Sequence, residues 1–104
     1  MDESFYTAQV PSNIADLIPG FLRNRHAEVA QLRALLQKGD YDKIIELADR
    51  MTGVGTPYGF PFITNQARNL REIAQRQDRR ALSELIDDLD KYLRAVKITV
   101  KPPK

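Results

Sequence analysis

Few side chains in this chain of 104 residues are suited to nucleophilic or acid–base chemistry. It has no cysteine and one histidine, His26, so neither a thiolate nucleophile nor a cluster of imidazole ligands is available. The most informative spacing starts at Asp49, which is followed by Thr52 three residues later, Gly53 four residues later and Gly59 ten residues later.

Composition excludes several classes of function. The chain is 42% hydrophobic and 29% charged, which is typical of one soluble globular domain. Its net charge of +2 comes from the tail, because removing Lys97, Lys101 and Lys104 leaves 2 − 3 = −1. The local arginines are not interleaved with aromatic residues, as a base-stacking surface would require. No apolar run approaches the roughly 20 residues that span a bilayer. We expect a cytoplasmic protein that binds neither nucleic acid nor membrane.

The elements that must position Asp49 are helices. Residues 1–11 show no sustained hydrophobic period and are predicted to form a loose arm. Residues 97–104 are predicted to form a basic, flexible tail. Ile98-Thr99-Val100 is β-prone but too short and unpartnered to change the fold class. Between them, 12–96 is predicted to form an all-α domain, an antiparallel four-helix bundle with a short additional N-terminal helix. Ser12 or Asn13 would cap that short helix.

Start and stop signals divide the bundle into four helices. The first helix has Pro19 in its first turn and stops at Gly39. The second helix is capped by Asp40 or Asp42 and ends within 53–57. The third runs from after Pro57 to about Gln75, and Asp78 caps the last. Arg25 interrupts the apolar stripe of the first helix. The inward positions expected from 3–4 spacing are Leu22, Val29, Leu32, Leu36, Ile44, Ala48, Met51, Phe60, Ile63, Ala67, Leu70, Ala74, Leu82, Leu85, Ile86, Leu89, Leu93 and Val96.

The spacing that starts at Asp49 resembles the motif of histidine-containing phosphotransfer (HPt) domains. In that family a His is followed by Lys three residues on, Gly four on and Gly ten on. Gly53 and Gly59 match the glycines, whereas Asp49 stands at the His position and Thr52 at the Lys position. The resemblance covers roughly 14–96. It implies a four-helix bundle with an exposed acceptor midway along one helix and, as partner, a receiver domain or sensor kinase of a two-component system.

The two motif glycines have a physical interpretation. A receiver must press close to the helix that carries the acceptor, and Gly53 one turn later would leave that backbone uncovered. Gly59 would let the next helix start against its neighbour. The alternative is that both glycines only end and restart helices.

The residues at the His and Lys positions, Asp49 and Thr52, argue against the phosphotransfer that the resemblance implies. Phosphorelay needs a nitrogen nucleophile, and an aspartate is phosphorylated only inside an acidic pocket that binds Mg²⁺. Asp42 and Glu46 lie along the same helical face as Asp49 and do not converge on it. Thr52 removes the cation beside the acceptor. We therefore expect no phosphotransfer, no catalytic residue, no metal and no cofactor, and we interpret His26 as a surface side chain.

Two arginines of the third helix are candidate partners for Asp49. Thr64, Arg68 and Arg71 form a stripe beside the apolar one, and in an antiparallel bundle this flank lies beside Asp49. We expect Arg71 or Arg68 to pair with Asp49. The alternative is two solvated arginines that contribute little to stability.

The favoured function is a non-catalytic, HPt-like docking module of phosphorelay signalling. One alternative is an active phosphotransfer protein with an unrecognised acceptor. Another is a bundle recruited to an unrelated protein or to self-association, for which exposed aromatics at Tyr58, Phe60 and Phe62 would be an indication. The predicted docking surface consists of Glu46, Asp49, Arg50, Thr52, Gly53 and Thr56.

Overall fold

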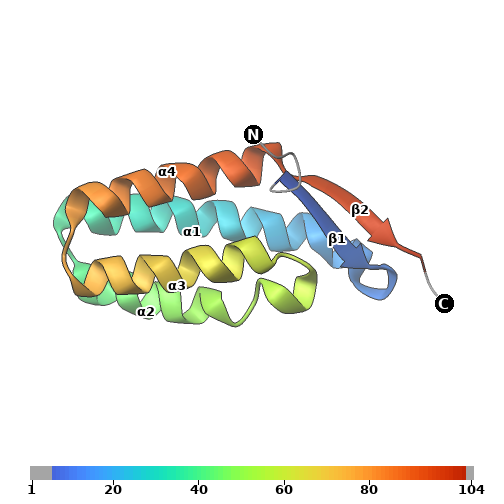
Figure 1. Cartoon of the computed structure of the whole chain (residues 1–104), viewed down its shortest axis with the longest axis horizontal. Coiled ribbons are helices and arrows are strands. Elements are labelled where there is room, and N and C mark those ends of the chain that lie inside the picture. The colour runs from blue at the N-terminus through green and yellow to red at the C-terminus, as the bar shows by residue number, and fades with distance from the viewer. Residues whose placement is uncertain (1–5, 103–104) are drawn as a thin grey trace.

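Four packed helices dominate the computed structural model, which describes residues 6–102 (Figure 1). They are α1 (Ile18–Lys38), α2 (Tyr41–Thr52), α3 (Pro61–Gln75) and α4 (Arg79–Ala95). Figure 1 shows the chain doubling back after each helix, so consecutive helices run in opposite directions. Each helix contacts the next, and α4 returns to α1. The four predicted helices are therefore all present.

The predicted helix ends are confirmed at most positions. Asp40 caps α2 by accepting from the Lys43 N–H at 3.2 Å, and Asp78 caps α4 by accepting from the Ala81 N–H at 3.0 Å. Gly39 ends α1 with a left-handed φ of 69°, a conformation that glycine adopts without strain. The cap predicted at Ser12 or Asn13 is wrong, because the 3₁₀ helix η2 (Ser12–Leu17) has no side-chain cap.

The core lies along the centre of the helices. Of the predicted inward positions, Leu22, Leu85 and Val96 are partly buried and all the others are buried. Phe60 has no exposed surface and stacks on Phe21, with ring centroids 5.0 Å apart. Large apolar side chains from all four helices therefore leave water together, which is the main stabilising term of such a fold.

Both ends of the described chain differ from the sequence prediction. Strand β1 (Thr7–Pro11) falls in the predicted loose arm, and β2 (Lys97–Lys101) in the predicted flexible tail. The two pair in parallel as a two-stranded sheet, with Val10 opposite Val100. The prediction that Ile98-Thr99-Val100 has no partner strand is wrong, because a pairing between segments so far apart in sequence leaves no local pattern. The remaining arm and tail residues, 1–5 and 103–104, lie outside the described residues.

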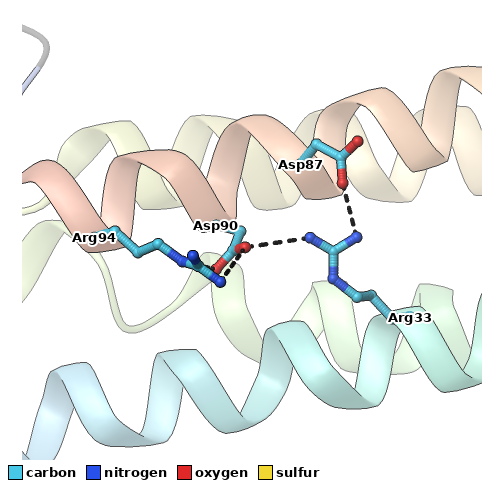
Figure 2. A network of polar contacts seen from close by, with 4 residues as sticks. All are labelled: Arg33, Asp87, Asp90 and Arg94. Carbon is cyan, nitrogen blue, oxygen red and sulfur yellow. Dashed lines mark hydrogen bonds and ion pairs between the residues drawn. The ribbon is translucent and has the colours of Figure 1, made fainter.

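A network of charged side chains joins α1 to α4 (Figure 2). Arg33 of α1 reaches Asp87 at 2.7 Å and Asp90 at 3.3 Å, and Arg94 also contacts Asp90 at 3.2 Å. These groups lie at the surface of the seam between the helices. Within residues 6–102, no helix is long and apolar enough to cross a membrane.

Candidate functional site

Asp49 lies on the exposed side of α2, next to α3. Its neighbours Ala48 and Met51 are fully buried, so helical periodicity turns the Asp49 side chain toward the surface. Arg71 of α3 pairs with it, with Nε 2.7 Å from Oδ1. About half of each side chain is exposed, 52% for Asp49 and 47% for Arg71. The predicted ion pair is thus present, and Arg71 rather than Arg68 forms it.

Arg68 remains beside this pair as a second cation. It lines a shallow pocket of about 390 Å³ together with Asp49, Thr52, Arg71 and Glu72. Within the described part of the chain, Arg68 forms no ion pair with another side chain. Two carboxylates and two guanidinium groups line the pocket, so its formal charge balances.

Thr52 and Gly53 shape the end of α2 next to Asp49. The Thr52 hydroxyl donates to the carbonyl oxygen of Asp49 at 2.7 Å, so it is turned back onto its own helix. Gly53 is exposed, and a Cβ there would meet nothing nearer than the carbonyl oxygen of Arg50 at 3.9 Å. Packing within the chain therefore does not require a glycine at position 53.

The connection from α2 to α3 depends on Gly55 and Thr64, which the sequence did not single out for this role. A Cβ on Gly55 would come within 2.5 Å of Thr64 Oγ1 and 2.6 Å of the Phe60 carbonyl oxygen. Buried Thr64 accepts hydrogen bonds of 3.0 Å from both the N–H and the hydroxyl of Thr56. The 3₁₀ helix η3 (Thr56–Tyr58) follows, so α3 begins at Pro61, later than predicted. Thr56 is thereby fixed within the connection while remaining exposed.

Gly59, at the end of η3, is the point where the α2–α3 connection contacts β1. Its φ of 93° lies in the left-handed region, and a Cβ would overlap the carbonyl oxygen of Gln9 in β1. The neighbour that requires a glycine at this position is therefore the strand and not another helix.

The predicted docking residues lie on two sides of α2. Glu46, Asp49, Arg50, Gly53 and Thr56 are exposed, and Thr52 is half-buried. Asp49 and Thr52 turn toward α3, whereas Arg50 lines a groove against α1. The structure thus brings Asp49 and Thr52 together with Arg68 and Arg71, and separates Arg50 from them.

Arg25, which breaks the apolar stripe of α1, has a structural explanation. Its Nε lies 2.5 Å from Glu28 Oε1, and its guanidinium carbon lies 4.7 Å from the centre of the Phe21 ring. Burial raises the pKa of Glu28, and the neighbouring Arg25 partly offsets that rise. A lone Arg and Glu three residues apart carry no sequence signal that they will be buried together.

The other candidate residues do not form a second site. His26 is exposed on α1. Phe60 is buried, and the half-buried rings of Tyr58 and Phe62 stack on Phe21 and Tyr92 with centroids 4.6 and 4.3 Å apart. Phe60 is therefore part of the core, and Tyr58 and Phe62 pack against it. Among residues 6–102, no three acidic or histidine side chains gather where they could hold a metal ion.

No protein-family model matches this chain, and neither a curated protein nor a solved structure matches it.

Proposed function

We propose that this protein is a non-catalytic, HPt-like docking module of two-component signalling. It would bind a receiver domain or a sensor kinase without carrying a phosphoryl group. One observation supports this most directly: Asp49, at the position of the family's acceptor His, is exposed on the second helix and already paired with Arg71 at 2.7 Å. The helical order and exposed Gly53 support the same proposal, whereas the contact with β1 accounts for Gly59 by itself.

The environment of Asp49 is suited to binding and not to phosphoryl transfer. A carboxylate that attacks a phosphoryl group needs a cation that neutralises both charges, usually Mg²⁺ in an acidic cage. Arg71 already occupies one oxygen of Asp49, and the Thr52 hydroxyl is held by the helix backbone. The site therefore presents a half-exposed carboxylate that is paired through one oxygen.

A receiver would meet this carboxylate with its own acidic, Mg²⁺-binding pocket. In the proposed complex, the free oxygen of Asp49 approaches that metal ion and imitates the charge of a phosphoryl group. Exposed Gly53 lies one turn away and offers no side chain that would hold the two backbones apart. The protein would then compete with active phosphotransfer domains or tether a complex.

The test is binding of the whole chain to a panel of purified receivers, with Mg²⁺, in the presence and absence of a phosphoryl mimic. We expect Asp49→Ala to weaken binding by about tenfold or more, as for removal of one charged contact at an interface. Asp88→Ala, an exposed aspartate of α4, is the matched control and should bind like the wild type. Equal binding by the Asp49 and Asp88 variants, or no binding to any receiver, would contradict the proposal.

Incubation with phosphorylated receivers distinguishes the alternative of an active phosphotransfer protein. Acid-labile label on the wild-type chain would overturn the docking-only function. Receiver binding without label would support it. Phe60 is buried, and the half-buried rings of Tyr58 and Phe62 pack against the core, so these aromatics do not form the exposed patch that would favour an unrelated partner at the α2–α3 connection.

A further inference from the structure

The two strands at the end of the helices are unequally covered. In β1, Ala8 and Val10 are buried. In β2, Ile98 is partly buried and the other residues are exposed, including half of Val100. A two-stranded sheet is marginal in water, and parallel strands are normally covered on both faces. The pair β1–β2 therefore has the character of an incomplete sheet.

In the part of the chain that the structure describes, the sheet has only these two strands, so no strand lies beside the outer edge of β2. The backbone of β1 lies against the α2–α3 connection, where the carbonyl oxygen of Gln9 faces Gly59. Figure 1 shows β2 on the outside of the molecule at this end, away from the four helices. Within residues 6–102 no other backbone group is hydrogen-bonded to this outer edge, so its alternate N–H and C=O groups can pair with another strand.

Lysines are the charged residues of this sheet. β1 reads Thr-Ala-Gln-Val-Pro and β2 reads Lys-Ile-Thr-Val-Lys, so neither strand contains an acid. Lys97 and Lys101 lie four residues apart and so share one face with Thr99, whose hydroxyl donates to the Ala8 carbonyl oxygen. Ile98 and Val100 occupy the other face.

We propose that the β2 edge accepts an extended, acidic segment of a partner protein by strand addition. Main-chain hydrogen bonds to the free edge would supply affinity. Acidic side chains opposite Lys97 and Lys101, with apolar ones beside Ile98 and Val100, would supply specificity. This surface is separate from Asp49, and the inference does not depend on the proposed receiver docking.

The same lysines disfavour a second copy of this chain as the occupant. Two copies of β2 related by a two-fold axis would pair antiparallel about Thr99. Lys97 would then lie directly opposite Lys101 of the second copy, twice in each dimer, and like charges in direct opposition destabilise a sheet. An acidic segment converts both contacts into opposite-charge pairs.

The test uses two blocked peptides as probes, Glu-Val-Thr-Ile-Glu and Lys-Val-Thr-Ile-Lys, titrated into the whole ¹⁵N-labelled protein. We expect the acidic peptide to shift and protect the amides of 97–101, with a Kd about tenfold below that of the basic peptide. The double variant K97E/K101E should reverse this preference. The variant K38E/K91E changes the net charge equally at exposed lysines of α1 and α4 and should leave the preference unchanged.

Three outcomes would overturn the proposal: β2 amides that respond to neither peptide, an acidic preference that survives in K97E/K101E, or dimerisation of the free chain through 97–101. Both variants alter exposed side chains, and an unchanged amide spectrum of the helices shows that they fold.

Discussion

At the scale of single residues, the pair between Asp49 and Arg71 is too exposed to matter greatly for stability. Surface ion pairs of this kind contribute about 0–1 kcal/mol. Substitutions at Asp49 should therefore leave the helices intact and report on binding or chemistry instead. This makes position 49 suitable for a gain-of-function experiment.

If the scaffold is of the HPt type, restoring the motif should restore the chemistry. We expect Asp49→His combined with Thr52→Lys to accept an acid-labile phosphoryl group from a phosphorylated receiver that binds the wild type. Arg71, 2.7 Å from the present carboxylate, would lie beside the phosphorylated imidazole and stabilise its charge. Glu46→His, one turn earlier on the exposed face of α2, is the control and should remain unlabelled. Failure of the double variant with every receiver that binds would argue against an HPt-type surface.

Glu28 makes the stability of the protein depend on pH. Burial raises its pKa above the ordinary value of 4.5, so the folded state holds this proton to a higher pH than the unfolded chain. Its contribution to the free energy of unfolding therefore falls as pH rises above about 4.5. Glu28→Gln keeps an oxygen for Arg25 and removes the titration, so its stability relative to the wild type should rise over that range.

Urea unfolding at several pH values measures this difference. Glu84→Gln, on the exposed face of α4, controls for the loss of one carboxylate. Parallel curves for the Glu28 variant and the wild type would show that Glu28 does not contribute to the pH dependence.

At the scale of elements, the α2–α3 connection separates two glycines that look alike in the sequence. Gly55→Ala would force a Cβ against Thr64 Oγ1 and the Phe60 carbonyl oxygen, at a cost of about 1–3 kcal/mol. Gly53→Ala enters open space at a φ of −88° and should be neutral or stabilise by up to about 1 kcal/mol. Urea unfolding compares them directly, and equal destabilisation would contradict this assignment. Under the proposed function, Gly53→Ala should still weaken receiver binding.

Among the elements, those specified by local sequence signals could be predicted and those that depend on the folded path of the chain could not. The helices, the Asp40 and Asp78 caps and the stop at Gly39 follow from signals within a few residues, and all are present. The Asp49–Arg71 pair could be predicted because Asp49 lies on the exposed flank of α2 and Arg71 on the flank of α3 that faces it in an antiparallel bundle. The contact of Gly55 with Thr64 depends on how the connection folds back, so residue types alone do not reveal it.

At the scale of the whole molecule, the two described ends of the chain meet in one sheet. Thr7 pairs with Lys97 and Pro11 with Lys101, so this contact closes nearly the whole chain into a loop. Among the helices, α2 and α3 pack mainly against each other, whereas α1 packs more against α4 than against α2. Contacts between distant segments form after local ones, because they must overcome the entropy of loop closure. The helical core should therefore be able to form and persist without β2.

Native-state hydrogen exchange tests this ordering. β2 buries little apolar surface, so the amides of 97–101 that pair with β1 should exchange through a local opening that releases the strand alone. We expect their opening free energy to lie about 2 kcal/mol or more below that of core amides such as Leu70 and Leu89, and to change little with denaturant. If they exchanged as slowly as Leu89, β2 would belong to the global folding unit. Fast opening would instead mean that the strand edge is held in place only weakly until a further strand pairs with it.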